Sequence, residues 1–141
     1  KMSEVNAAFG LLQLKHIQTA LAARQAVDEF YREHLGNVPG INILTSTAET
    51  VRNYSYFPVL VTEEYPLSRD ELYEKLKQNN VFARRYFYPL ISHFPMYSGL
   101  SSAKAKNLSV AESAANQVLC LPIHSGMYDS AKFVVDKIKD F

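Results

Sequence analysis

The sequence predicts an α+β domain in which a long N-terminal helix packs with a small, mainly antiparallel sheet and further helices. Segments with helical spacing of apolar residues alternate with a few short runs that are rich in β-branched and aromatic residues. Hairpin signals between these runs are weak, and the sequence shows no internal repeat. The length of 141 residues suits one domain, and 48% hydrophobic and 21% charged residues are ordinary for a globular protein.

The first helix is expected to run from Ser3 to about His34. Ser3 is a suitable N-cap, and Glu4 puts a carboxylate in the first turn, where the helix dipole favours it. Apolar residues then arrive so densely between Val5 and Leu14 that they surround the helix axis instead of forming one stripe. This part of the helix therefore needs neighbours on several sides, which indicates that the chain is part of something larger.

Four later segments are expected to be extended. Tyr54–Thr62 has the strongest strand composition, and Pro58 within it is expected at a bulge or on an edge because proline lacks a backbone donor. A polar loop at residues 45–52 precedes it. The other three expected strands are Ile41–Leu44, Val81–Tyr88 and Leu119–Ile123.

Three helices complete the prediction. Capping boxes at Ser68–Glu71 and Ser109–Glu112 predict helices that run to residue 79 or 80 and to about residue 118. Asp129 is expected to cap the last helix. The buried face of that helix is expected to consist of Ala131, Phe133, Val134 and Ile138.

Composition excludes several kinds of partner. A formal net charge of +1 gives no general attraction to nucleic acid or to a membrane surface, and no apolar run approaches the ~18 residues of a membrane span.

The single cysteine, Cys120, lies among aliphatic residues and is expected to be buried. These features are compatible with the cytoplasm, where we expect the protein to be. Lys1 precedes Met2, which suggests a cut inside a longer polypeptide.

The sequence offers no metal site and no phosphate loop. The 4 histidines stand at no metal-ligand spacing from one another, from Cys120 or from a carboxylate, and the 5 glycines never cluster. A nucleophile elbow and paired cysteines are also missing from the sequence. We therefore assign no catalytic, cofactor-binding or metal-binding residue to this chain.

The candidate site residues are Arg84, Tyr86, Tyr88 and His93. On a strand, the first three would share one face, which would offer a guanidinium for phosphate and two phenols for hydroxyl or base contacts. The alternative is a structural role, in which Arg84 pairs with Glu71 or Glu74 and the tyrosines belong to the core. Spacing alone leaves both interpretations open. His124 could also face a cleft, although a solvated loop histidine is the commoner outcome.

Three ordered segments resemble the DegT/StrS-type sugar aminotransferases. Residues 1–14 are similar to the helix that follows the lysine region in that family. Arg84–Leu90, with residues 94–97 after it, resembles the family's "R-x-Y-F-x-P-L … P-x-Y" segment. Ala111-Glu112 and Leu119–His124 resemble its "A-E … L-x-L-P-x-H" segment. Each motif is weak alone, but their order and spacing agree over nearly the whole chain.

The resemblance implies a pyridoxal-phosphate (PLP) enzyme of fold type I that moves an amino group from glutamate to a keto-sugar nucleotide. Residues 1–141 would be its C-terminal small domain, in a protein expected to be a homodimer. The family's Schiff-base lysine and most of its phosphate ligands belong to a large N-terminal domain that these residues do not include. Lys1, Lys104 and Lys106 do not match the Schiff-base position. The chain alone is therefore expected to bind no cofactor and to be inactive.

Two functional classes remain open at this point. The first is the small domain of a sugar aminotransferase, and the segments Tyr54–Phe57 and Arg84–Tyr88 look most like members that act on dTDP-linked 4-keto-6-deoxyhexoses. The second is a freestanding, non-catalytic interaction domain with the same fold. The strongly apolar first helix favours the first class, because a freestanding domain would hide Phe9 and Leu12.

Overall fold

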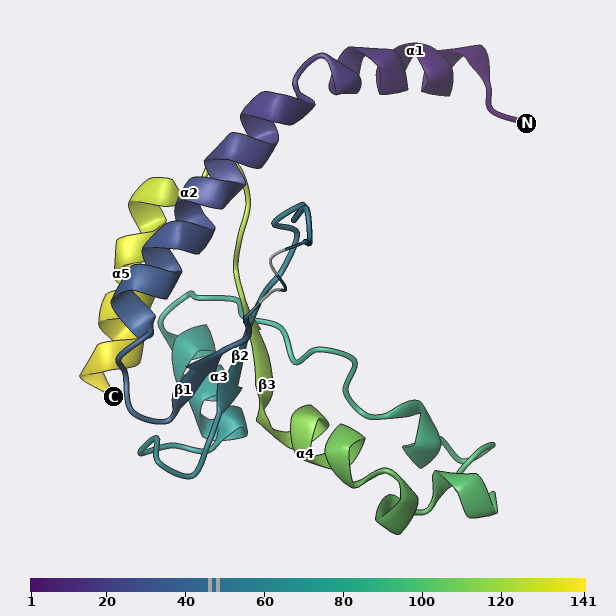
Figure 1. Ribbon diagram of the computed structural model, residues 1–141, viewed down its shortest axis with the longest axis vertical. Helices are drawn as coiled ribbons and strands as arrows, with labels where there is room; N and C mark the ends of the chain where they lie inside the picture. Colours follow the sequence, from purple (N-terminus) through teal and green to yellow (C-terminus); the bar gives the residue numbers. More distant parts are fainter. Residues whose placement is uncertain (46, 48) are drawn as a thin grey trace.

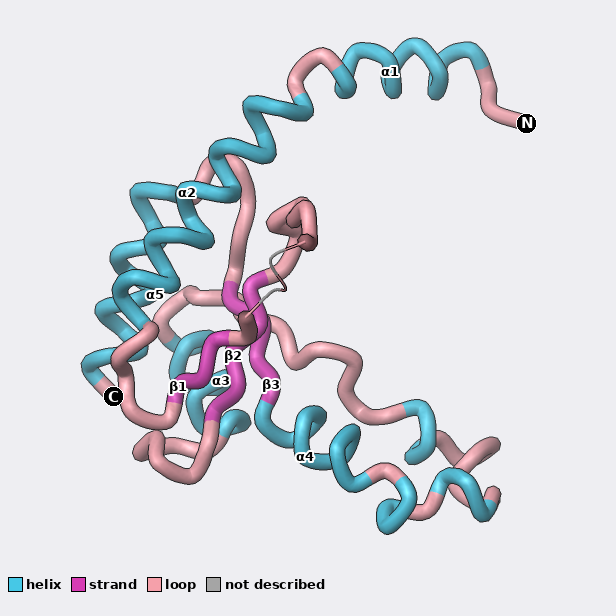
Figure 2. Tube along the Cα trace, viewed as in Figure 1, coloured by secondary structure: helices cyan, strands magenta, loops and turns pink. Residues whose placement is uncertain are grey.

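A three-stranded antiparallel sheet lies at the centre of the protein, in the order β1-β2-β3 (Figures 1 and 2). Its strands are β1 (Ile41–Ile43), β2 (Phe57–Val61) and β3 (Val118–Leu121). The computed structural model describes residues 1–45, 47 and 49–141, so positions 46 and 48 of the predicted 45–52 loop lie outside the described residues. Helices and a small antiparallel sheet confirm the predicted α+β class.

Three helices cover one face of the sheet and enclose the core. They are α2 (Ile17–Leu35), α3 (Arg69–Gln78) and α5 (Tyr128–Asp140), and α2 and α5 lie side by side (Figure 1). Every second residue of β2 is buried, as expected for a strand with one face toward a core. The core side chains with no more than 1% exposure include Val27, Tyr31, Leu35, Phe57, Val59, Leu72, Leu76, Leu119, Ala131 and Ile138.

The expected single N-terminal helix is in fact two helices. α1 (Glu4–Leu14) ends where the amides of Lys15 and His16 bond to carbonyls three residues back, Leu12 and Gln13, which tightens the backbone into a turn. α1 then projects away from the rest of the chain (Figure 1). None of its residues is buried, and Phe9 and Leu12 are 63% and 51% exposed. The prediction that this part of the chain has too much apolar surface for one face is thus confirmed.

Helix starts were predicted with mixed success. The Ser68 capping box at the start of α3 is present with both of its reciprocal bonds. The second capping box was wrong, because α4 (Ser109–Gln117) begins at Ser109 itself and Leu108 is its N-cap. The cap at Asp129 was also wrong, because α5 begins one residue earlier, after Met127.

The buried face of α5 was predicted correctly except at one position. Ala131, Val134 and Ile138 are buried, but Phe133 is 48% exposed. Val135 is buried in its place, because the helix packs on α2 and α3 with a slightly rotated face.

The predicted strand at 81–88 was wrong. Only Arg84 pairs in β fashion, through two backbone hydrogen bonds with Cys120 on the outer edge of β3. The chain turns immediately afterwards, and Phe87 takes a positive φ of 45°, which no extended strand allows. The placement of Pro58 on an edge strand was also wrong, because β2 is the central strand. Pro58 is tolerated there because β1 pairs only with Val59–Val61 and stops short of it.

Candidate functional site

A polar hollow of about 320 Å³ holds the first predicted site residue, Arg84. The backbone pairing with Cys120 places Arg84 on the outer edge of β3. Ser55 and Tyr56 directly precede β2, which pairs with the other edge of β3, so they line the hollow on the side opposite Arg84. Among the described residues, Arg84 makes no ion pair. The alternative in which Arg84 pairs with Glu71 or Glu74 is therefore wrong, and its exposed guanidinium remains available to an anionic ligand.

His124 lines the same hollow in a fixed orientation. Its Nδ1 accepts a hydrogen bond from the amide of Gly126 at 3.2 Å. In the neutral ring the proton then resides on Nε2, which makes that nitrogen a hydrogen-bond donor. Below the hollow, burial raises the pKa of the Cys120 thiol to about 11, against the opposing effect of the Arg84 charge. Cys120 is therefore an inert wall and not a nucleophile.

Tyr86 lines a second hollow, which is apolar and measures about 470 Å³. This hollow lies on the sheet face opposite the main core, between α4 and the turn at 86–87. The ring of Tyr86 meets that of Tyr56 edge-on, with centroids 5.3 Å apart. Tyr56 borders both hollows and is therefore the wall between them. The other lining residues are Leu44, Pro58, Leu60, Phe87, Leu90, Ala111, Ala114, Ala115, Val118 and Cys120.

Tyr88 lies apart from Arg84 and Tyr86. Two guanidinium groups contact its ring, that of Arg69 at 4.8 Å and that of Arg85 at 5.4 Å from the ring centroid. Arg85 also pairs with Asp70 at 3.2 Å, which ties this cluster to the start of α3. The structural ion pair that the sequence analysis considered for Arg84 is thus made by its neighbour Arg85, with Asp70 as the partner.

His93 belongs to a third place. It ends the short 3-10 helix η1 (Ile91–His93), and its Nε2 lies 2.8 Å from Oε1 of Glu112 on α4. This contact explains why Glu112 does not form the predicted capping box. The pair ties the segment that carries η1 to α4.

Arg84, Tyr86 and Tyr88, which were expected to share one strand face, therefore do not share one, and His93 lies at a further place. Arg84 lines the polar hollow and Tyr86 the adjoining apolar hollow, whereas Tyr88 and His93 make contacts elsewhere with Arg69 and Arg85, and with Glu112. Their expected common face depended on an extended strand, and the turn at Tyr86–Phe87 removes it.

Sequence reasoning missed two features of the site. Ser55 and Tyr56 were expected in a strand and belong to a segment that resembles the family, but neither was predicted as a site residue, and β2 begins after them, at Phe57. Asp28 and Arg52 were not singled out at all, although they pair across 24 residues of sequence. A signal for Asp28 existed, because an acidic residue interrupts the apolar stripe of α2 four residues before Arg32.

No lysine lines the two hollows that hold Arg84 and Tyr86. In the described part of the chain, no three His, Cys, Asp or Glu side chains gather as a metal site. Across these residues no helix is both long enough and apolar enough to cross a bilayer.

Comparison with known proteins gives sugar transaminases as relatives. The chain is 49% identical to dTDP-4-amino-4,6-dideoxy-D-glucose transaminase of Escherichia coli over 98% of its length, and 47% identical to the transaminase of the same name from Shigella dysenteriae. It covers 37% and 38% of those two proteins, so it spans little more than a third of their length.

Solved structures share the fold. The crystal structure of Streptomyces venezuelae DesV in complex with ketimine intermediate matches 99% of this chain with a TM-score of 0.86 and 29% identity. DesI in the presence of its TDP-sugar product matches 98% with a TM-score of 0.80 and 27% identity. The chain covers 36% and 35% of those two structures.

The family assignment rests on a match that covers almost every residue. Residues 1–139 match the DegT/DnrJ/EryC1/StrS aminotransferase family, in agreement with the three ordered motifs and with the α+β fold. The chain belongs to the DegT/DnrJ/EryC1/StrS aminotransferase family.

Proposed function

We propose that this chain is the C-terminal small domain of a PLP-dependent sugar aminotransferase that moves an amino group from glutamate to a dTDP-linked 4-keto-6-deoxyhexose. The observation that carries the proposal is the 49% identity to dTDP-4-amino-4,6-dideoxy-D-glucose transaminase over 98% of the chain. The rest of the enzyme is a large N-terminal domain that holds PLP, and the enzyme acts as a cytoplasmic homodimer. PLP supplies the electron sink for amino transfer.

The contribution of this chain is to bind and orient the sugar nucleotide. The guanidinium of Arg84 has the fork geometry and permanent charge that suit a diphosphate. Nε2 of His124 adds a second donor at the same hollow, and the Tyr56 ring adds a flat amphipathic wall for the sugar or the base. Tyr86 extends that wall through its contact with Tyr56. Tyr88 and His93 then act on the substrate only through the segments that they hold in place.

The experiment is to measure Arg84→Ala in the full-length enzyme. Loss of a charge-assisted hydrogen bond costs about 1.5–3 kcal/mol, so we expect a roughly 10- to 100-fold rise in KM for the sugar nucleotide. KM for glutamate should stay nearly constant. The matched control is Arg85→Ala, which removes the adjacent arginine, already paired with Asp70 and outside the hollow. Equal effects of the two variants, or equal effects on both substrates, would return Arg84 to a structural role.

The 141-residue chain alone is proposed to be inactive. The Schiff-base lysine of the family belongs to the large domain, and no lysine lines the hollows of Arg84 and Tyr86, so we expect PLP to find no amine there with which to react. After mixing with PLP and borohydride reduction, peptide mass spectrometry should find no single lysine that carries the cofactor stoichiometrically. Stoichiometric labelling of one lysine would contradict the proposal. The freestanding interaction domain is the weaker candidate, because no observation favours it specifically.

A further inference from the structure

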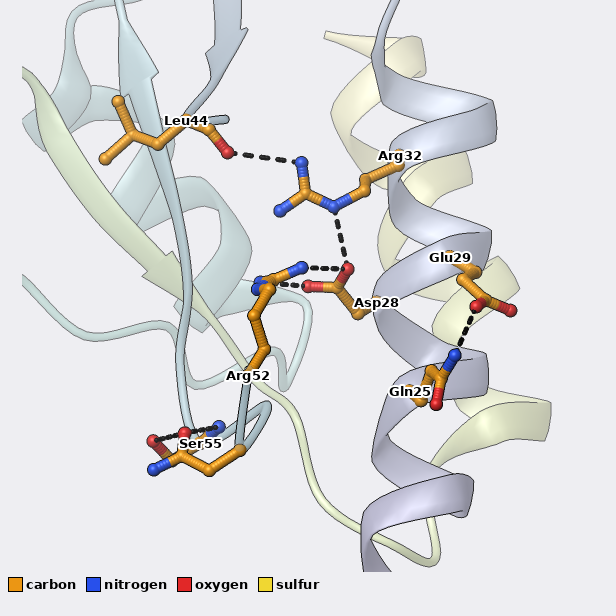
Figure 3. Close-up of polar contacts among 8 residues, drawn as sticks. Gln25, Asp28, Glu29, Arg32, Leu44, Arg52 and Ser55 are labelled. Carbon is orange, nitrogen blue, oxygen red and sulfur yellow. Dashed lines mark hydrogen bonds and ion pairs between the residues drawn. The ribbon is translucent and has the colours of Figure 1, made fainter. Parts of the chain in front are cut away.

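One buried carboxylate, that of Asp28, is bound by the side chains of two arginines. Asp28 of α2 is 1% exposed, and two guanidinium groups meet it (Figure 3). Arg52 binds it through a fork, Nη1 to Oδ1 and Nη2 to Oδ2, both at 2.7 Å, and Nε of Arg32 reaches Oδ1 at 2.7 Å. A buried carboxylate with this geometry holds its partners firmly, because any displacement would leave a charge unpaired.

Arg52 connects this carboxylate to a segment outside the sheet. Residues 52–56 precede β2, which begins at Phe57, so strand pairing does not hold them. The guanidinium of Arg52 lies 5.0 Å from the ring centroid of Tyr54. Tyr54 has a φ of 51°, a conformation that a non-glycine residue keeps only where its surroundings impose it. The contacts of Arg52 are therefore suited to impose the path of the segment.

The same segment builds one side of the polar hollow. Oδ1 of Asn53 accepts hydrogen bonds from the amide of Ser55 at 3.1 Å and from its hydroxyl at 2.7 Å. This turn directs the chain so that Ser55 and Tyr56 line the hollow opposite Arg84 and His124. Asp28 on α2 is thus linked to the wall formed by Ser55 and Tyr56. The link runs through Arg52 and through contacts within residues 52–56.

We propose that Asp28, acting through Arg52, is a positioning residue that fixes residues 52–56 so that Ser55 and Tyr56 form the substrate-facing wall opposite Arg84. This rests on the proposed function, in which the hollow binds the sugar nucleotide. A purely structural role would make the cluster important for stability alone. Arg32 separates these two roles, because it pairs with the same carboxylate but donates its other bond to the carbonyl of Leu44, which does not line the hollow of Arg84.

The test compares Arg52→Gln with Arg32→Gln in the full-length enzyme. Arg52→Gln removes the fork and the contact with Tyr54, so KM for the sugar nucleotide should rise about tenfold while kcat and KM for glutamate change less than about twofold. Arg32→Gln leaves the fork in place and should keep the wild-type KM values. Arg52→Lys keeps the charge without the fork and should give an intermediate KM.

Hydrogen exchange provides a readout that does not depend on activity. Amide exchange in a peptide covering residues 53–57 should speed up in Arg52→Gln and stay near wild type in Arg32→Gln. Equal exchange in the two variants would overturn the proposal, and so would a wild-type KM in both Arg52→Gln and Arg52→Lys. If Arg84→Ala raises KM but Arg52→Gln does not, the positioning role is wrong and the proposed function stands. If Arg84→Ala has no effect, the proposed binding of the sugar nucleotide in this hollow fails, and the exchange result alone decides the positioning role.

Discussion

The stability of this domain should depend strongly on the buried charged residue Arg69. It is 3% exposed at the start of α3, and its Nη1 donates to the carbonyls of Ala115 at 2.9 Å and Val118 at 3.1 Å. These carbonyls lie at the C-terminal end of α4, where a helix leaves its acceptors without intrahelical partners. A cation at that end also complements the helix dipole. Arg69 therefore links α3, α4 and β3.

The perturbation is Arg69→Met, which keeps most of the aliphatic volume and removes the donors. Each charge-assisted bond contributes about 1.5–3 kcal/mol, and because one nitrogen serves both carbonyls we expect a combined loss of about 2–4 kcal/mol. That is a large share of the ~5–15 kcal/mol by which a domain is stable. Nε of Arg69 also lies 2.9 Å from Oδ1 of Asp70, at an angle that makes no hydrogen bond, so we add little for that ion pair.

Arg85→Met is the matched control. Arg85 pairs with the same Asp70 and stacks on the same Tyr88 ring, but its side chain is 35% exposed and donates to no carbonyl of α4. An ion pair of this kind contributes about 0–1 kcal/mol. The two variants thus differ in burial and in the carbonyl bonds, while the charge change is the same.

The assay is urea unfolding of the 141-residue chain, followed by far-UV circular dichroism. With a slope of about 1–3 kcal/mol/M, Arg69→Met should lower the midpoint by roughly 1–2 M without changing the slope. Arg85→Met should lower the urea midpoint by only a small fraction of the shift expected for Arg69→Met. Equal shifts for the two variants, or a loss below about 1 kcal/mol for Arg69→Met, would refute the role of the carbonyl bonds.

Two further outcomes are expected. The isolated chain should self-associate through the exposed apolar side chains of α1, and a native chain that is already monomeric would contradict this. Replacing Phe9 and Leu12 with serine should make the chain monomeric by sedimentation, whereas Phe133→Ser, at an exposed aromatic residue of α5, should not. The free energy of unfolding should fall as the pH rises from about 9 to about 12. Burial raises the pKa of Cys120 from 9.0 to about 11 and that of Tyr65 from 10.0 to about 12. The folded state therefore holds these protons more tightly than the unfolded state, which loses them first as the pH rises. The urea midpoint measured across this range checks the sign, Cys120→Ala should flatten the fall at its lower end, and a rising midpoint would be the contrary result.

Local signals in the sequence were sufficient for most of the elements. The capping box at Ser68, the β-branched run before Thr62 and the aliphatic run around Cys120 each predicted an element that the structure contains. These predictions succeeded because caps, period and β-branching act on neighbouring residues, whatever the rest of the chain does. The density of apolar residues in α1 likewise indicated an exposed surface without any knowledge of the fold.

The site depended on contacts between residues far apart in sequence. Cys120 holds Arg84, Asp28 holds Arg52, and Arg69 holds the end of α4. The partners in each pair are too far apart in the sequence for a local pattern to predict the contact. The strand expected at 81–88 failed for the same reason, because its composition favours extension and only one residue finds a strand to pair with. Local chemistry therefore determined most of the helices and strands and the apolar surface of α1. The tertiary structure decided which arginine is buried, which is paired and which faces the hollow. The physical reason is that the free energy of a charged side chain depends on its burial and its partners, and both arise only when distant segments pack together.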